Sequence, residues 1–235
     1  MLVILAALLA CGPKKNNNTG NASASRAGSS TVTLDGEEIR VRWDDGDTFR
    51  WTDGGEEKSA RLLGFNTLES YGPVHRWGGW SGSALMKIAD EATAVASEGS
   101  WECTTAEGGG GYGRGLIDCP QLRRRLLRLG LAHAYTINGT SDAGDLGVQA
   151  NAISSQAGMW ASGAPEGIVT SLHSDQEDPE KQAYDRVCSV TTGRCAKVSH
   201  RESYRTCEEV GHQGSFMLYV PYEHRYGDSK PDCIR

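Results

Sequence analysis

The sequence predicts a β-barrel combined with α-helices, followed by a small cysteine-rich C-terminal module. Short runs that alternate between apolar and polar residues begin at residue 31, as expected for half-buried strands. Three stretches between residues 81 and 160 then repeat their apolar residues with a helical period. After residue 161 this periodicity ends, and four of the seven Cys residues lie in the part that follows. Strands first, then helices with one hairpin between them, are typical of a small barrel capped by helices.

The first residues are predicted to direct export. Residues 1–10 form an apolar run that is too short to span a bilayer, for which about 20 residues are needed. The run ends in Leu8-Leu9-Ala10-Cys11, which is similar to a bacterial lipobox. Residues 1–11 therefore predict a signal peptide with lipidation at Cys11, and ordinary secretion is the alternative. Residues 12–30, rich in Asn, Ser and Gly, predict a flexible tether to a membrane of the bacterial cell envelope.

The strands are predicted from their alternation and from the turns between them. Asp35-Gly36 and Asp53-Gly54-Gly55 are residues that favour hairpin turns. A run of Gly at 108–111 separates the fifth and sixth expected strands. The expected strands are 31–34, 39–43, 48–51, 60–63, 101–105, 116–118 and 132–137.

Three helices are expected, each with one apolar face. In the first, at 81–97, this face holds Ala84, Ile88, Ala92 and Val95. The second begins at Pro120 and ends at Gly130. Its leucines are expected to face inward and its arginines outward into solvent: Leu122, Leu126, Leu129 and Arg123, Arg124, Arg125, Arg128. The third carries Leu146, Ala150, Ile153 and Ala157 and ends near Trp160.

The chain divides into a main domain at 31–161, a polar acidic linker at 162–182 and a disulfide-rich module at 183–235. Cys11 aside, six Cys remain, an even number that suits an exported protein with up to three disulfides. Cys103 and Cys119 are equidistant from residue 111, so a symmetric hairpin places them opposite each other and predicts a disulfide. The four remaining Cys are expected to pair among themselves, in any of three ways.

The charge restricts the function. With 24 Lys and Arg against 30 Asp and Glu, the formal net charge is −6. Strong non-specific binding of polyanions is therefore not expected, and any contact with nucleic acid has to rely on local Arg residues and a metal ion.

Three motifs carry chemistry that suits phosphodiester cleavage. They are Asp45-Gly46-Asp47-Thr48, then Arg61-Leu62-Leu63-Gly64 ending at Glu69, then Tyr112-Gly113-Arg114-Gly115-Leu116. Carboxylates can hold a cation and activate water, and Arg side chains stabilise charge on a phosphate. In this order the motifs, D-G-D-T, R-L-x-G-x-x-x-x-E and Y-G-R-x-L, resemble the thermonuclease (staphylococcal nuclease-like) family over residues 31–161.

The resemblance implies a five-stranded OB-fold barrel with three helices and Ca²⁺-dependent hydrolysis of DNA or RNA. It implies that Asp47, Asn66 and the Thr67 carbonyl hold Ca²⁺, and that Glu69 orients or deprotonates the attacking water. It further implies that Arg61 and Arg114 bind the phosphate. Asn66 departs from the family, which has a metal-binding Asp there, and Leu68 replaces the usual Pro; the loss of one charge is expected to weaken Ca²⁺ binding.

Tyr112 and Tyr135 are expected to border or stack on a nucleotide. The expected partners are thus a nucleic-acid substrate and a membrane, the latter through Cys11, and the chain is expected to be a monomer. A non-catalytic OB-fold binding protein or structural lipoprotein of the envelope is the alternative. The acidic composition and Asn66 favour that alternative, whereas Arg61, Glu69 and Arg114 favour the enzyme.

Overall fold

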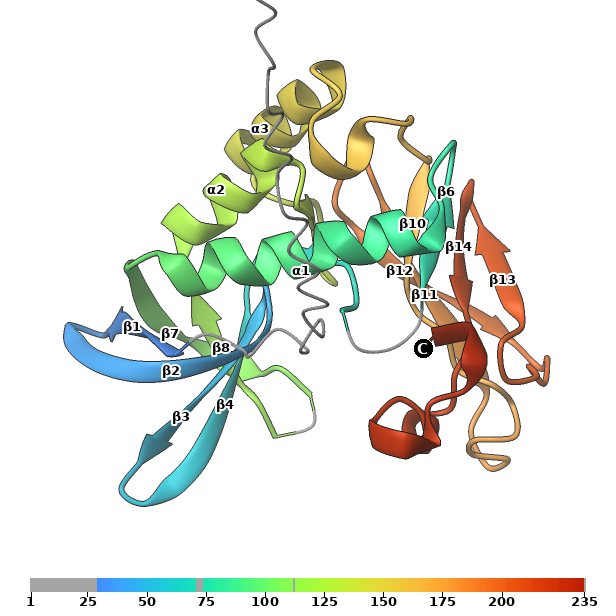
Figure 1. Cartoon of the computed structure of the whole chain (residues 1–235), viewed down its shortest axis with the longest axis horizontal. Coiled ribbons are helices and arrows are strands. Elements are labelled where there is room, and N and C mark those ends of the chain that lie inside the picture. The colour runs from blue at the N-terminus through green and yellow to red at the C-terminus, as the bar shows by residue number, and fades with distance from the viewer. Residues whose placement is uncertain (1–28, 71–73, 112, 235) are drawn as a thin grey trace, which may run out of the picture.

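A computed structural model of the chain describes residues 29–70, 74–111 and 113–234. Within these residues a closed β-barrel forms one side of the molecule, three α-helices cover it, and smaller sheets form the other side (Figure 1). The barrel strands are β1 (Ser29–Leu34), β2 (Glu37–Asp45), β3 (Thr48–Asp53), β4 (Glu56–Leu62), β7 (Trp101–Gly109) and β8 (Gly115–Asp118). The other strands are β5 (Phe65–Thr67), β6 (His75–Trp77), β9 (Ala132–Ala134), β10 (Gly167–Ser171), β11 (Ala183–Ser189), β12 (Cys195–His200), β13 (Glu209–His212) and β14 (Ser215–Leu218). The helices are α1 (Gly82–Glu98), α2 (Pro120–Leu129) and α3 (Ala143–Ser154), with 3-10 turns η1 (Gly158–Trp160), η2 (Tyr222–His224), η3 (Gly227–Ser229) and η4 (Asp232–Ile234).

The barrel has six strands among the described residues, in the order β1-β2-β3-β4-β8-β7, with β7 returning to β1. The count of five implied by the family resemblance is therefore wrong, although the alternation of the sequence anticipates all six. The additional strand arises because Asp35 and Gly36 both take positive φ angles, 51° and 89°, and turn the chain back at Leu34. The Asp35 carboxylate then accepts hydrogen bonds from the amide and hydroxyl of Thr105 on β7.

The disulfide between Cys103 and Cys119 is confirmed. Thr104 lies opposite Asp118 in the antiparallel ladder of β7 and β8, so the next pair outward is the two Cys residues. Their Cα atoms are 4.4 Å apart. The symmetry of the hairpin about residue 111 is thus sufficient to predict this disulfide, although the β7–β8 ladder shifts register nearer the hairpin tip.

Helix α1 runs from beside β6 to a position over the barrel (Figure 1). Its buried residues are Leu85, Ala89, Ala92 and Ala96, one position along the helix from most of the predicted stripe. Ala92 and Ala96 belong to the barrel core, which is centred on Trp43 and Phe49, and Leu85 and Ala89 belong to a second core with Trp77 and Trp160. The small Ala side chains allow the helix to pack closely on the barrel end.

Helix α2 begins at Pro120 and ends at Gly130, which takes the left-handed conformation as predicted. One of its arginines contradicts the expected solvent-facing set. The Arg123 side chain is only 12% exposed and forms ion pairs with Asp118 and Asp145. Its aliphatic part also fills the space beside Gly64, where a Cβ would lie 2.7 Å from the Arg123 Cδ.

Helix α3 buries a different face from the predicted one. Its buried residues are Asp145, Gln149 and Ala152, whereas Ala150 is exposed. Asp145 is the partner of Arg123, and Gln149 accepts from the Ala134 amide and donates to the Val190 carbonyl. Polar residues thus form the inner face because each has a buried partner, which an apolar period does not reveal.

The segment at 162–182 is not the polar linker expected from its composition. It contains β10, in which Ile168 and Val169 are buried, and β10 pairs with β11. The C-terminal part is also not a separate module, because β14 pairs with β6 in the order β13-β14-β6. Residues expected to lie in separate domains therefore share one sheet.

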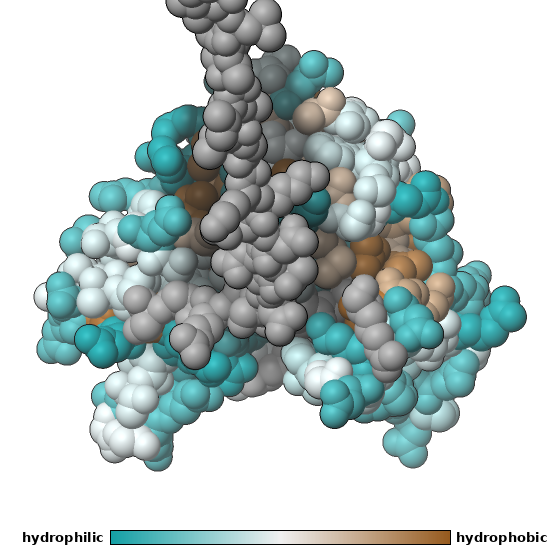
Figure 2. Space-filling view, viewed as in Figure 1, coloured by the Kyte–Doolittle hydropathy of each residue, from teal (hydrophilic) through white to brown (hydrophobic). Residues whose placement is uncertain are grey.

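The C-terminal sheets have their own core and two further disulfides. The core includes Val169, Val187, Tyr204 and Met217. The Cys pairs, which the sequence left open, are Cys188–Cys195 and Cys207–Cys233. Hydrophilic side chains cover much of the visible surface (Figure 2). In the part of the chain that the structure describes, no helix is long and apolar enough to cross a membrane.

Candidate functional site

The acidic turn between β2 and β3 lies against β5 and α1 because residue 46 is Gly. A Cβ at Gly46 would lie 2.7 Å from Thr67 Cγ2 and 3.0 Å from Ala92 Cβ, so a side chain there would push the turn away. The Asp45 carboxylate accepts a hydrogen bond of 3.0 Å from the Asp47 amide and holds the turn closed. Both carboxylates are consequently buried at this end of the barrel.

Asp47 is 1% exposed and accepts hydrogen bonds at both of its carboxylate oxygens. Its Oδ1 accepts from the Thr48 hydroxyl at 3.0 Å and from the Arg61 guanidinium. Its Oδ2 accepts from the amide and hydroxyl of Thr67 at 2.7 and 3.1 Å. The first and second motifs of the sequence therefore meet at this carboxylate.

Arg61 lies opposite Thr48 in the β3–β4 ladder, which places its side chain beside Asp47. One guanidinium nitrogen donates to Asp47 and the other to the Asn66 side-chain oxygen. Burial opposes the charge of this group, but the negative charges of Asp47 and Asp45 outweigh that effect and raise the pKa of Arg61. Arg61 is thus a permanent cation, and 17% of its side chain remains exposed.

Asp45 lies in an environment that disfavours its ionised form. Burial raises the pKa of Asp45 well above its ordinary value, and the charges of Asp47 and Glu69 raise it further, against the opposing effect of Arg61. This carboxylate was part of the acidic motif but was not predicted as a site residue. A cation beside Asp45 would oppose this effect, because a positive charge favours the ionised carboxylate.

Asn66 and Thr67 lie on β5, which pairs with β9. The Asn66 amide nitrogen donates to the Thr67 carbonyl at 2.5 Å, and the Asn66 oxygen accepts from Arg61. The donor set of Asp47, Asn66 and the Thr67 carbonyl is oxygen only, which fits a hard cation such as Ca²⁺ in kind. Among the described residues, however, no group of three or more His, Cys, Asp or Glu is arranged as a metal site. Two of the oxygens that would hold the cation, on Asp47 and Asn66, instead accept from Arg61.

Arg61 and Arg114 both lie close to Gly110, whose lack of a side chain leaves room for both of them. A Cβ at Gly110 would lie 2.8 Å from the Arg61 Cβ and 3.3 Å from the Arg114 Cβ. The Gly110 amide donates to the Arg114 carbonyl at 2.8 Å, and the Arg114 side chain donates to the Gly110 carbonyl at 3.0 Å. Gly110 was not predicted as a site residue, although the Gly run at 108–111 was its signal. Tyr112 lies outside the described residues.

Glu69 follows β5 and is half-buried. Its charge raises the pKa of Asp45, and it adds to the effect of burial in raising the pKa of Tyr226, which lies between η2 and η3. Glu69 is therefore close to the acidic turn on one side and to the C-terminal segment on the other. No pattern in the sequence indicates that the C-terminal part reaches this site.

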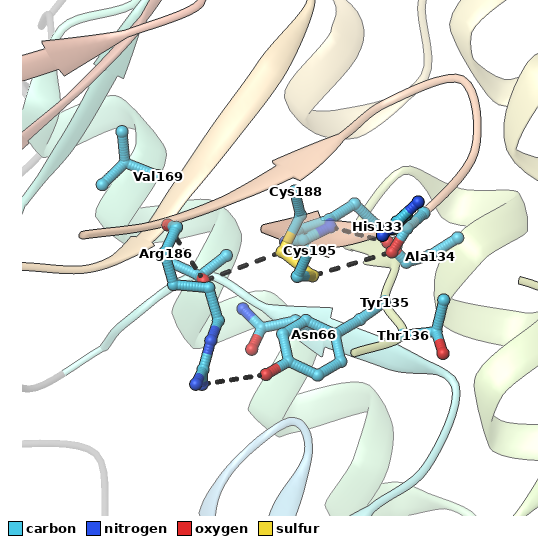
Figure 3. The surroundings of a disulfide bond; sticks show 12 residues. Asn66, His133, Ala134, Tyr135, Thr136, Val169, Arg186, Cys188 and Cys195 are labelled. Carbon is cyan, nitrogen blue, oxygen red and sulfur yellow. Dashed lines mark hydrogen bonds between the residues drawn. A yellow bond between two sulfur atoms is a disulfide. The ribbon is translucent and has the colours of Figure 1, made fainter. Parts of the chain in front are cut away.

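Tyr135 lies between two arginines. The Arg61 guanidinium carbon is 5.5 Å from the centre of its ring, and the Arg186 guanidinium donates to its hydroxyl at 3.2 Å. Figure 3 shows Arg186 of β11 extending toward the Tyr135 hydroxyl, with Asn66 beside the ring. Arg186, like Asp45 and Gly110, is not predicted as a site residue by the sequence, because it comes from the expected separate module.

Two buried histidines lie behind the site. His133 on β9 pairs with Asn66, and His75 lies on β6. Burial lowers the pKa of His75 to about 3 and that of His133 to about 4, and the neighbouring His133 adds to the effect on His75. Both nitrogens of His75 and the Nε2 of His133 have no hydrogen-bond partner among the described residues.

The geometry joins Asp45, Asp47, Arg61, Asn66 and Thr67 by hydrogen bonds, and places Arg114 and Glu69 beside them. No protein-family model and no curated protein matches the chain. Function is therefore inferred from these residues and their surroundings. Cys11 lies outside the described residues.

Proposed function

We propose that the chain is a Ca²⁺-dependent phosphodiesterase that hydrolyses nucleic acid, as its resemblance to thermonucleases implies. The observation that supports this most is the pair of arginines, Arg61 and Arg114, on the two sides of Gly110 and next to a buried acidic turn. Two guanidinium groups suit the oxygens of one phosphate, because each presents a planar fork of donors. Arg61 would bind the phosphate while keeping part of its contact with the Asp47 carboxylate.

Each residue has a distinct task in this proposal. Arg61 and Arg114 bind the phosphate and stabilise the charge that develops on it. Glu69, half-buried beside the acidic turn, orients the attacking water or accepts its proton. Asp47, Asn66 and the Thr67 carbonyl would hold the cation, which supplies positive charge beside the phosphate when bound.

The finer features of the fold belong to the same proposal. The order β1-β2-β3-β4-β8-β7 with helices over one end is compatible with an OB-fold barrel enlarged by the β1–β2 hairpin. We propose that the protein acts as a monomer, exported to the bacterial cell envelope. The lipobox-like sequence before Cys11 supports a lipid anchor there, and mass spectrometry of the membrane fraction should detect an acylated amino-terminal Cys11.

The test of the activity is hydrolysis of labelled single-stranded DNA and RNA oligonucleotides of the same sequence. With Ca²⁺ we expect cleavage of at least one of them, and with excess EGTA we expect cleavage to stop. Cleavage that continues undiminished in EGTA would exclude the role given to Ca²⁺. Binding of the oligonucleotide without cleavage would instead support a non-catalytic OB-fold protein, which the bonds from Arg61 to both Asp47 and Asn66 also favour.

A further inference from the structure

A row of cationic and aromatic side chains continues from Arg61 onto the C-terminal sheet. Arg61 lies over Tyr135, and the Tyr135 hydroxyl accepts from Arg186 at 3.2 Å. The Arg186 guanidinium is 5.8 Å from the centre of the Tyr184 ring, and the Lys197 ammonium is 4.1 Å from the same ring. The row thus places three cations in sequence, separated by two tyrosine rings.

The sheet keeps this row on one face. Arg186 pairs with Lys197 across the β11–β12 ladder, and Tyr184 lies two residues before Arg186, so the three side chains share a face. Asp185, between them, points to the other face and is fully buried. On this face successive side chains along β11 are about 7 Å apart.

Backbone hydrogen bonds fix the row to the barrel. The Cys195 amide donates to the Thr136 carbonyl at 2.7 Å, and the Thr136 amide donates to the Gly193 carbonyl at 2.8 Å. Tyr135 is therefore held at a constant position relative to the start of β12. The His173 ring, 4.5 Å from that of Tyr184, supports the far end of the row.

The charges of this row differ from those of the rest of the molecule. The protein is acidic, with a net charge of −6, and many of its cations pair with carboxylates, as Arg50, Arg76 and Arg123 do. Arg186 and Lys197 form no ion pair with any residue that the structure describes. Each lies against an aromatic ring instead, which leaves its positive charge available to an anion.

We propose that Arg186 and Lys197 bind successive phosphates of a single nucleic-acid strand whose reacting phosphate lies at Arg61, an inference that rests on the proposed function. Tyr135 and Tyr184 hold the cations apart and present ring surface to unpaired bases. An acidic protein needs such a local row, because its overall charge repels a polyanion. A single strand fits better than a duplex, whose bases are not free to contact the rings.

The experiment measures binding of a fluorescent oligothymidylate of twelve nucleotides. EGTA is present to remove Ca²⁺, so that cleavage does not interfere. Arg186→Gln and Lys197→Gln are compared with wild type and with matched controls, Arg125→Gln on α2 and Lys87→Gln on α1, both of which remove exposed cations. We expect each row variant to weaken binding about five-fold. We also expect the slope of log affinity against log salt to become less negative by about 0.7, because one phosphate contact is lost. The controls should change neither quantity.

The outcomes separate this inference from the proposed function. If the row variants bind like the controls while wild type still cleaves the oligonucleotide, the proposed phosphate binding by Arg186 and Lys197 is wrong and the proposed hydrolysis is supported. If the row variants lose affinity but no variant or wild type cleaves, the row stands and the activity is wrong. Equal loss in controls and row variants, or binding of phosphatidylglycerol vesicles with none of oligonucleotide, would overturn the row. Thermal unfolding of each variant establishes that it is folded.

Discussion

Each half of the molecule contains a fully buried aspartate, and the two differ in what binds them. Asp47 at the barrel end is 1% exposed, and Asp185 in the C-terminal sheet is 0% exposed. Asp47 forms an ion pair with Arg61, a permanent cation. Asp185 accepts hydrogen bonds from the Tyr204 hydroxyl at 2.8 Å and from His200 and His212 at 3.2 and 2.7 Å. The same side chain is therefore satisfied in two different ways.

The difference indicates which of the two is a site. Around Asp185 the donors surround one carboxylate, so the cluster is complete in itself and serves the core that contains Tyr204. Around Asp47 the buried Asp45 and the half-buried Glu69 add two further carboxyl groups, and burial, followed by the charges of Asp47 and Glu69, raises the pKa of Asp45. A cluster of carboxyl groups with a perturbed pKa, beside a partly exposed Arg61, is typical of a binding or catalytic site.

The histidines of the two regions differ in the same way. His200 and His212 both bond to a carboxylate. His75 and His133, behind the Asp47 site, leave three ring nitrogens without partners among the described residues, and burial lowers their pKa to about 3 and about 4. The first pair stabilises its core, whereas the second makes its surroundings sensitive to acid.

The largest expected effect is the loss of stability in acid. In the folded chain the pKa of each of His75 and His133 lies below the ordinary 6.5, so the folded state binds fewer protons than the unfolded chain. Their contribution is therefore complete above pH 6.5 and is lost as the pH falls, until about pH 4 for His133 and about pH 3 for His75. Between pH 7 and pH 5 the two should together cost about 4 kcal/mol of unfolding free energy, as measured by urea denaturation.

His75→Leu tests that origin. It should remove about half of the change, roughly 2 kcal/mol, because one of the two groups no longer titrates. The control is His224→Gln, which replaces a histidine with a 47% exposed side chain and should leave the pH dependence as in wild type. If His75→Leu keeps the full change, the buried pair does not cause the acid sensitivity.

Asp185→Ala should be the most destabilising substitution in the C-terminal half. It leaves the buried Tyr204 and the partly buried His200 and His212 without this acceptor, at a cost of about 3 kcal/mol. If the proposed activity is present, hydrolysis measured well below the midpoint of unfolding should remain, because the bonds of Asp185 do not involve the proposed phosphate-binding residues Arg61 and Arg114. A variant that is stable but inactive would show that the two regions are not independent.

Arg61→Ala should reduce activity even where the variant is fully folded. It removes a guanidinium from the charge proposed to develop on the phosphate, and hydrolysis measured well below the midpoint of unfolding should fall about 100-fold or more. The loss of the ion pair with the buried Asp47 should also lower stability. Arg125→Ala on the exposed face of α2 is the control and should cleave at the wild-type rate. Near wild-type rates for Arg61→Ala would favour the non-catalytic alternative.

The sequence was informative where the relevant contacts are local. Cys103 and Cys119 face each other across one hairpin, and Asp47 meets Arg61 across another, since Thr48 and Arg61 pair. Strand alternation and turn residues are sufficient to predict such neighbours. The same is true of α2, whose limits at Pro120 and Gly130 follow from backbone conformation alone.

Contacts between distant segments were not predictable in this way. Arg186 bonds to Tyr135 across 51 positions, and β14 pairs with β6 over an even longer separation. No local period encodes these returns of the chain, so the sequence predicts a linker where the structure has β10. The inward turn of Arg123 was missed for a related reason, because its carboxylate partner Asp145 comes from the next helix.

The smallest expected effect concerns Asn66, where the chain departs from the family it resembles. Asn66 accepts from Arg61 and donates to the Thr67 carbonyl. Asn66→Asp adds a negative charge where a cation is proposed to bind, and we expect Ca²⁺ affinity to rise about ten-fold, measured by calorimetry with Ca²⁺ alone. Asn138→Asp, which adds the same charge at an exposed position, is the control.

The same substitution should lower stability without the cation, because the new carboxylate meets Asp45 and Asp47 and loses the bond to the Thr67 carbonyl. Asn66→Asp should therefore unfold at a lower temperature than wild type in EGTA and gain more from added Ca²⁺, since only the folded state holds the ion. Arg61 opposes part of this effect, because it can pair with both carboxylates. If Ca²⁺ affinity is equal in Asn66→Asp, Asn138→Asp and wild type, residue 66 does not face the cation and Arg61 alone neutralises the acidic turn.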